Sequence, residues 1–371
     1  MISGKCDKQK MHQIHDKKNV IKLIVPTGLI AKSLLMDSKI YLIVNLFIGF
    51  VFVFKGLFVI YAAFNIESSE EILISRIEDL FNRINDILLG VCVIYFRINR
   101  SKYQRSFSSL SQILVTDNTV ADQYVSHHRK IFRYIYLFAI VYEFLSDLVM
   151  DYPPYISKMI KHDHTVIRKT FAIIVRLLVS YAWILFVQFI FETCVHLQSA
   201  FIVISSNVSR VNKRSPLSSH KIQTFRQMYS QTGEIIANID SFLVLTVLGL
   251  YIYLVATCHF NLVKLFHGEK TSESIMGLIF FGSHTVYLIF MTFHFVHVNL
   301  LSVKCYETVY SLSFGYYSPE IINEIRLFLE RIGRHDVGFT FAKIFVISSN
   351  FVSSLATISL TIALAAPNLL Q

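Results

Sequence analysis

The sequence is poor in charged residues, and this shortage is the most informative feature of its composition. Only 16% of the 371 residues are Asp, Glu, Lys or Arg, whereas a soluble domain carries about a quarter. The 13 Gly and 6 Pro are too few for a collagen-like or low-complexity disordered chain. Nucleotide-binding loops and the common catalytic motifs are also absent. Disorder is therefore excluded, and a soluble enzyme or a nucleic-acid-binding protein is disfavoured.

The sequence is instead rich in long apolar segments, with 54% hydrophobic residues and a mean hydropathy of +0.52. An apolar run of about 20 residues spans the hydrocarbon core of a bilayer as a helix. The runs lack the ten-residue alternation of a β-barrel, so helices must satisfy the backbone polar groups. We therefore predict an all-α membrane protein. Its seven transmembrane helices are expected at residues 40–64, 80–96, 131–150, 171–191, 242–263, 275–301 and 344–366.

The positions of the basic residues predict the orientation in the membrane. With an intracellular N-terminus, 23 of the 35 Lys and Arg lie in intracellular segments and six in extracellular ones, as the positive-inside rule requires. The extracellular segment 151–169 is the exception, with four basic residues. The first 20 residues are rich in lysine and lack the apolar region of a signal peptide. We expect the first span to act as its own insertion signal.

The predicted intracellular segments keep a helical spacing of apolar residues. Residues 200–214 continue the fourth span, and residues 230–240 lead into the fifth. A further helix is predicted at 319–331, and its Ile325 and Leu329 are expected to face a neighbouring subunit. The predicted organisation is a cytoplasmic N-terminal region (1–39), a six-helix ligand-binding transmembrane bundle with cytoplasmic extensions (40–301), a cytoplasmic anchor region (302–343), and a pore-lining seventh helix with a short extracellular C-terminus (344–371).

A few ionisable residues fall within or near the predicted spans, where they are costly. Asp147 and Arg176 lie at similar depth in the third and fourth spans. An ion pair between them would either fix the register of two helices or contribute to a ligand cavity, and both interpretations stay open. Lys343 is expected to be an interfacial anchor. His294 and His297 lack a Cys, Asp or Glu at ligand spacing, so we predict neither a metal site nor a cofactor.

The last predicted span carries a stripe of small and polar side chains at spacings of three and four residues, which places them on one helix face. Such a stripe suits either close helix packing or the wall of a water-filled pore. The asparagines at both ends favour the pore. The predicted pore-lining residues are Asn350, Ser354, Thr357, Thr361, Ile362, Ala365, Asn368 and Leu369. Ile362 and Leu369 are expected to form an apolar gate that opens when the helix rotates.

The C-terminal residues also carry a family resemblance. Residues 339–345 read Phe-Thr-Phe-Ala-Lys-Ile-Phe, and the same spacing continues through Thr361, Ile362, Asn368 and Leu369. With h for a hydrophobic residue, this resembles the patterns F-T-A-x-G-h-F and T-Y-h-h-h-h-h-Q-F of insect gustatory receptors. These belong to the seven-helix insect chemoreceptor superfamily, and the sequence is most similar to divergent moth and butterfly members. A lysine stands at the glycine position of the first pattern, and only Thr361 matches the second pattern in identity.

The resemblance implies a ligand-gated, non-selective cation channel in the plasma membrane of gustatory receptor neurons. It implies a homotetramer or a heterotetramer with related receptors. Its pore, lined by four last spans, would conduct monovalent cations and could also pass divalent cations. Ala363 replaces the Glu of sugar-sensing members, which favours bitter or other plant compounds as ligands. The family places the pocket among the outer halves of the preceding helices. The expected ligand-binding residues are Asp147, Arg176, Tyr181, Tyr253, Phe280, His284 and Tyr287.

Two other classes of membrane protein are alternatives. A seven-helix G-protein-coupled receptor would have an extracellular N-terminus, a D-R-Y-like end to the third helix and N-P-x-x-Y in the seventh, and the sequence shows none of these. A small-molecule transporter would show two similar halves or paired broken helices. Staining of an N-terminal tag in intact and permeabilised cells distinguishes the channel from the G-protein-coupled receptor.

Overall fold

The computed structural model describes residues 26–36, 38–65, 73–149, 165–214, 217–267 and 271–369. Within these ranges the chain is almost entirely helical, which confirms the predicted all-α membrane fold. The helices are α2 (Leu29–Leu35), α3 (Lys39–Asn65), α4 (Leu73–Ile98), α5 (Arg100–Val115), α6 (Asn118–Val149), α8 (Thr165–Arg214), α9 (Ser219–His267), α10 (Thr271–Tyr310), the 3-10 helix η1 (Ser311–Phe314), α11 (Pro319–Gly333) and α12 (Ser349–Leu369).

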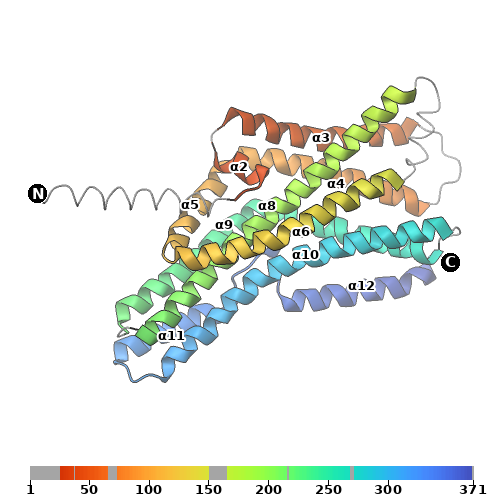
Figure 1. Ribbon diagram of the computed structural model, residues 1–371. Helices are drawn as coiled ribbons and strands as arrows, with labels where there is room; N and C mark the ends of the chain where they lie inside the picture. Colours follow the sequence, from red (N-terminus) through yellow and green to blue (C-terminus); the bar gives the residue numbers. More distant parts are fainter. Residues whose placement is uncertain are drawn as a thin grey trace, which may run out of the picture.

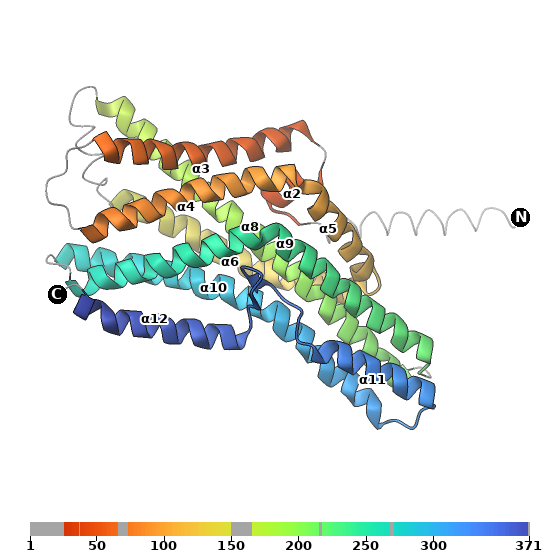
Figure 2. The same cartoon turned by 180° about the vertical axis from the view of Figure 1, so that it is seen from behind.

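The long helices run between the two ends of an elongated bundle (Figures 1 and 2). At one end, which we call the α11 end, α8, α9 and α10 extend beyond the other helices, and α11 packs against α9 and α10. At the opposite end α9 and α12 finish. α3 and α4 lie very close together at two glycines. A Cβ added to Gly90 would lie only 2.6 Å from the carbonyl oxygen of Gly49. Small residues thus let these two backbones meet, as is common between membrane helices.

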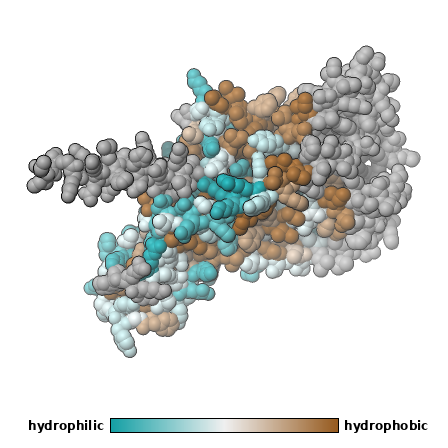
Figure 3. Space-filling model, in the orientation of Figure 1, coloured by the Kyte–Doolittle hydropathy of each residue, from teal (hydrophilic) through white to brown (hydrophobic). Residues whose placement is uncertain are grey.

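Four helices contain segments that are long and apolar enough to cross a membrane, within the described residues. They are Lys39–Phe58, Leu177–Val211, Ser219–Leu262 and Gly277–Phe314. These segments include parts of the first, fourth, fifth and sixth predicted spans. Figure 3 shows hydrophobic surface over α3 and hydrophilic surface over the first part of α6. The spans predicted within α4, α6 and α12 stay predictions, and so does the total of seven.

α8 and α9 are much longer than a bilayer is thick. Their 50 and 49 residues extend over about 75 Å at 1.5 Å per residue, against about 30 Å for the hydrocarbon core. Both therefore continue outside the membrane, and the helical continuations predicted at 200–214 and 230–240 are confirmed.

The helix predicted at 319–331 is present as α11, but one expectation about its apolar face is wrong. Ile325 is only 2% exposed and packs within its own chain, together with Phe328 and Ile332. Leu329 is half-buried against the same core. The reason is that α9 and α10 extend far enough to cover this face of α11. The large apolar side chains that α11 leaves exposed are Ile322 and Leu327.

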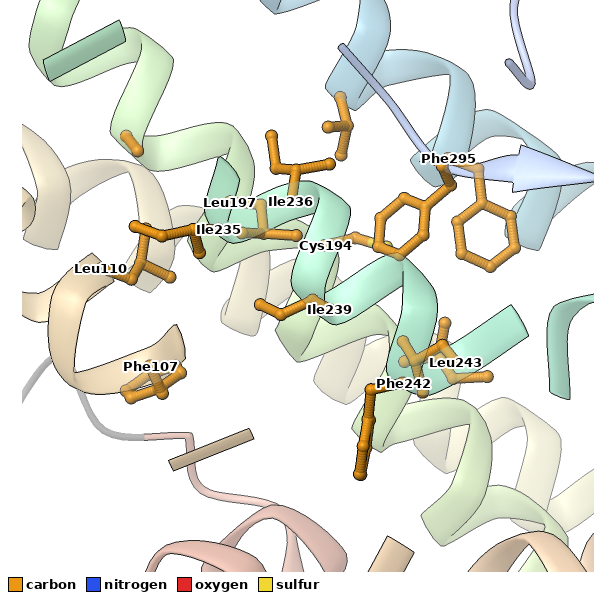
Figure 4. Packing of buried hydrophobic residues seen from close by; sticks show 14 of the residues in the cluster. Phe107, Leu110, Cys194, Leu197, Ile235, Ile236, Ile239, Phe242, Leu243 and Phe295 are labelled. Carbon is orange, nitrogen blue, oxygen red and sulfur yellow. The ribbon is translucent and has the colours of Figure 1, made fainter. Parts of the chain in front are cut away.

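The hydrophobic core is centred where α5, α8, α9 and α10 meet, and Figure 4 shows part of it. Cys194 and Leu197 from α8 face Ile236 and Leu243 from α9, with Phe295 from α10 beside them. Every side chain of α8 from 189 to 201 is buried. A helix that is buried on all sides forms the centre of a large bundle.

Three features besides the short helix η1 were not predicted. α2 and α5 lie in stretches that we expected only as intracellular segments. The third is a hairpin of β1 (Thr340–Phe341) and β2 (Phe345–Val346), antiparallel, with Thr340 opposite Val346. The hairpin includes the expected start of the last span, so the boundary predicted at residue 344 is wrong. α12 begins only at Ser349, because residues 345–346 pair as a strand.

A buried carboxylate attaches α2 to α8. Glu192 of α8 is 2% exposed and accepts hydrogen bonds from the backbone N–H groups of Thr27, at 2.6 Å, and Gly28, at 3.1 Å. The Thr27 hydroxyl also donates to it, and Arg129 of α6 lies 4.0 Å away. The contacts of Thr27 and Gly28 with Glu192 join residues more than 160 positions apart, so no local pattern could predict them.

Candidate functional site

A cluster of aromatic side chains lies between α8, α9 and α10. Trp183 of α8 makes edge-to-face contacts with Tyr253 of α9 and Tyr287 of α10, with ring centroids 6.0 and 6.1 Å apart. The hydroxyl of Tyr253 lies 3.3 Å from Nε2 of His284, a hydrogen-bonding distance. Phe280 packs against the His284 ring one helical turn away, at 6.3 Å. All five side chains of this cluster are half-buried.

The aromatic cluster lies well inside the bundle. Tyr253 is about 20 Å along α9 from its end at His267, and His284 is about 20 Å along α10 from its start at Thr271, at 1.5 Å per residue. Helices of this length place the cluster near the middle of the predicted spans. Aromatic faces with a few hydrogen-bonding groups are typical of pockets for small organic molecules.

The structure brings together four of the seven expected ligand-binding residues: Tyr253, Phe280, His284 and Tyr287. Tyr181 is 45% exposed and lies next to Tyr136 of α6. Asp147 belongs to α6 and Arg176 to α8, but their side chains lie outside the described residues.

Sequence reasoning missed Trp183, which contacts two of the expected residues. The signal that could have found it is its rarity, because it is the single tryptophan of the chain. It also lies within a predicted span, two positions from Tyr181.

α12 packs on α9 along one narrow face. Phe351 and Leu355 are half-buried there, and the Phe351 ring lies 5.3 Å from that of Tyr251. Nε2 of His259 approaches the carbonyl oxygen of Ser359 at 3.3 Å. In Figure 2, α12 lies at the margin of the bundle and beside α9. The pore helix expected from the sequence is thus the least enclosed of the long helices described.

The polar stripe of α12 faces away from the rest of the chain. Asn350, Ser354, Thr357 and Thr361 are all exposed. At 100° per residue, the centre of this stripe is more than 90° around the helix from the face that contacts α9. Ile362, Ala365, Asn368 and Leu369 also belong to α12, and their side chains lie outside the described residues. The gate that we expect at Ile362 and Leu369 stays a prediction.

The hydroxyl groups of the stripe bond to their own helix. Thr357 donates to the carbonyl of Ser353, and Thr361 to the carbonyl of Thr357, each at 2.9 Å. Such bonds satisfy the hydroxyl donor and leave its oxygen lone pairs free to accept from water or to contact a cation. The stripe can therefore face water without any partner from another helix.

The base of α12 is attached to α9 by a buried carboxylate. Asp240 accepts hydrogen bonds from the backbone N–H of Thr340, at 2.9 Å, and from its hydroxyl, at 2.7 Å. Nζ of Lys343 lies 2.6 Å from the same carboxylate. We expected Lys343 to be an interfacial anchor, and that role stays a prediction. The hairpin turns its ammonium group towards Asp240, a contact that the sequence did not indicate.

Among the described residues, no group of three or more His, Cys, Asp or Glu side chains could hold a metal ion. His294 is surrounded by Phe191, Phe290 and Phe293, with ring centroids 4.7 to 5.3 Å apart. The aromatic neighbours give this side chain a packing role in the core between α8 and α10.

The helices are arranged as in a solved insect olfactory receptor, as comparison with known structures shows. The structure of the insect olfactory receptor OR5 from Machilis hrabei matches with a TM-score of 0.61, over 95% of this chain and 98% of that one, at 13% sequence identity. The same receptor in complex with eugenol matches with a TM-score of 0.48, over 96% and 99%, at 16% identity. No family model and no curated protein matches the sequence. At this identity the first likeness establishes the fold alone.

Proposed function

We propose that the chain is a subunit of a ligand-gated, non-selective cation channel of the insect chemoreceptor type. The observation that carries the proposal is the surface of α12, a helix that leaves a stripe of Asn, Ser and Thr exposed. A polar stripe is unfavourable against lipid and suits the wall of a water-filled pore. The fold shared with an insect olfactory receptor supports the same class.

The assembly that we propose has four subunits, either identical or related, with one α12 from each around a central pore. Hydroxyl groups would line it, and no carboxylate is on the stripe, so monovalent cations would pass with little selection and divalent cations could follow. The apolar side chains of Ile362 and Leu369 would close the pore by excluding water. The exposed Ile322 and Leu327 of α11 would lie in contacts between subunits.

The ligand site that we propose is the aromatic cluster of Trp183, Tyr253, His284 and Tyr287, extended by Phe280, Tyr181, Asp147 and Arg176. Flat organic molecules can stack on its rings, while the hydroxyl of Tyr253 and the imidazole of His284 orient polar groups. The C-terminal resemblance favours a gustatory receptor in the plasma membrane of gustatory receptor neurons. Its ligands would be bitter or other plant compounds.

The test is expression in oocytes with a panel of plant compounds, measured as inward current. We expect at least one compound to evoke current in injected oocytes and none in uninjected ones. Tyr253→Phe should then raise the half-maximal concentration about fivefold, because one hydrogen bond contributes about 1 kcal/mol. Tyr306→Phe, at an exposed tyrosine of α10, is the matched control and should change nothing.

Two outcomes would contradict this proposal. The first is protein at the cell surface without any evoked current across the panel. The second is an N-terminal tag that stains in intact cells, since an extracellular N-terminus would favour the G-protein-coupled receptor.

A further inference from the structure

α9 is the helix that contacts both the aromatic cluster and α12. Its Tyr253 belongs to the cluster through His284. Its Tyr251 packs on Phe351 of α12, and its His259 approaches the backbone of α12 at Ser359. A displacement of α9 caused by a ligand would therefore reach α12 directly.

The strongest polar contact between α9 and the segment that leads into α12 is at Asp240. This side chain is 1% exposed. It accepts two hydrogen bonds from Thr340 and pairs with the ammonium group of Lys343 at 2.6 Å. Ion pairs and hydrogen bonds to a buried carboxylate are short and directional, and a buried carboxylate left without them is costly. The contact therefore fixes where the hairpin sits on α9.

The hairpin itself is stiff and short. Its turn is closed by a hydrogen bond from the N–H of Ile344 to the carbonyl of Phe341, at 2.9 Å, and its base by one from Ile347 to Phe339, at 2.8 Å. Phe339 and Ile347 are fully buried. α12 begins two residues after Ile347. A shift of the hairpin must therefore turn or tilt the first residues of α12.

The backbone at Lys343 has an unfavourable conformation, and the ion pair of the lysine side chain holds it. Ala342 and Lys343 have φ values of 52° and 63°, a left-handed conformation that glycine adopts freely and that a Cβ makes unfavourable. Lys343 occupies it nonetheless, with its ammonium group on Asp240. Strained backbone of this kind persists only where surrounding contacts hold it.

We propose that Asp240 is a positioning residue for the pore helix, which holds the β1–β2 hairpin through Thr340 and Lys343 and so sets the rotation of α12 relative to α9. Ligand-induced movement of α9 is then passed to α12 through this contact. The gating role rests on the proposed channel function, whereas the positioning of α12 does not.

The first test measures the rotation of α12 by chemical labelling, so it does not depend on channel current. Cysteine is placed at Thr357 on the stripe or at Ile358 beside it, in a Cys6→Ser background, and the labelling rates by a water-soluble thiol reagent are compared in membranes. We expect Lys343→Met to change the ratio of the two rates at least threefold. Lys304→Met, at an exposed lysine of α10, is the matched control and should leave the ratio unchanged.

Lys343→Gly is a second variant in case Lys343→Met does not fold. It also removes the ammonium group, and glycine adopts the left-handed backbone conformation of the turn without strain. We expect the same change in the labelling ratio as for Lys343→Met. If both variants keep the wild-type ratio, Asp240 does not position α12 and the proposal is wrong. A lowered melting temperature with an unchanged ratio would likewise leave only a structural role and overturn it.

The second test concerns gating. Lys343→Met and Asp240→Asn should each raise the half-maximal ligand concentration at least fivefold, and the double variant should do no more than the stronger single one, since both act through one contact. Additive effects would overturn the coupling role. If the wild type gives no evoked current, the proposed function fails, while the labelling ratio still decides whether Asp240 positions α12.

Discussion

α3 and α12 both lie at the surface of the bundle, and α12 exposes a stripe of polar side chains, beside Val352 and Ile358, where α3 exposes large apolar ones. On α3, Phe50, Phe54 and Phe58 form an exposed ladder with ring centroids 5.8 and 6.0 Å apart. On α12 the exposed residues include Ser354 and Thr357, and none of its described side chains is buried. Large apolar groups suit lipid, whereas small hydroxyl groups suit water or a neighbouring backbone. The two surfaces are therefore built for different surroundings.

The comparison also distinguishes the helix that holds the core together from the helices that face the surroundings. The inner part of α8 is buried on every side, so its packing determines whether the bundle folds. α3 and α12 contribute less to that core, and their exposed faces determine what the folded subunit can touch. Substitutions in the buried part of α8 should thus lower the yield of folded protein. Substitutions on the exposed faces of α3 and α12 should instead change what the folded subunit contacts.

The largest effect is expected in the core. Phe96 of α4 is fully buried and packs against Phe242 at 4.8 Å and Phe186 at 6.1 Å. Phe96→Ala should lower the free energy of unfolding by about 3–5 kcal/mol, through lost packing and the cavity left behind. The yield of monodisperse protein in size-exclusion chromatography should fall sharply.

The matched control for Phe96 is Phe47→Ala on the exposed face of α3, where the side chain is 51% exposed. Its effect should stay within about 0.5 kcal/mol, as for most surface substitutions. Equal losses at both positions would show that α3 packs against something other than lipid.

The sequence alone predicts the helices that depend on long apolar runs, and it fails where structure depends on distant partners. The apolar run at residues 40–64 corresponds to α3, because length and hydropathy are local properties. The hairpin before α12 could not be predicted, because a two-residue strand has no periodicity and its position depends on Asp240, a hundred residues earlier.

The candidate site shows the same division between local and distant signals. The stripe of α12 follows from helical spacing alone, and its described side chains are exposed. The partnership of Trp183 with Tyr253 and Tyr287 depends on the crossing of three helices. The burial of Ile325 depends on how far α9 and α10 extend. No pattern within a single helix contains that information.

The same substitution on the two exposed helices is the sharpest test of their difference. Phe50 is 63% exposed near the middle of its predicted span, so Phe50→Asp should cost about 2.5–3.5 kcal/mol of insertion free energy. Thr357→Asp places the same carboxylate on the stripe of α12, where water would solvate it. We expect cell-surface biotinylation to fall several-fold for Phe50→Asp and to stay near the wild-type level for Thr357→Asp.

Thr357→Asp has a second expected result if the stripe lines a pore. Four carboxylates around the axis would attract cations, so the permeability of divalent relative to monovalent cations should rise. A loss of surface protein as large as that of Phe50→Asp would instead place Thr357 against lipid, and the contrast between the two helices would disappear.

The smallest effect on folding is expected on α11, which adds a third kind of exposed surface. Ile322 is 52% and Leu327 is 37% exposed, at the end of the bundle where the helices extend beyond the predicted spans. Apolar side chains exposed to water in this way often lie in contacts between subunits. Ile322→Asp with Leu327→Asp should change the melting temperature of the subunit little, while native gels show less tetramer. Asn323→Asp, at an exposed neighbour on the same helix, adds a charge without removing an apolar group and should keep the tetramer.

The buried face of α11 should behave differently. Ile325→Asp should unfold the subunit, because it places a charge in the core of its own chain. Tetramer that survives the double substitution would mean that this face of α11 meets water in the assembly, and that the subunits associate elsewhere.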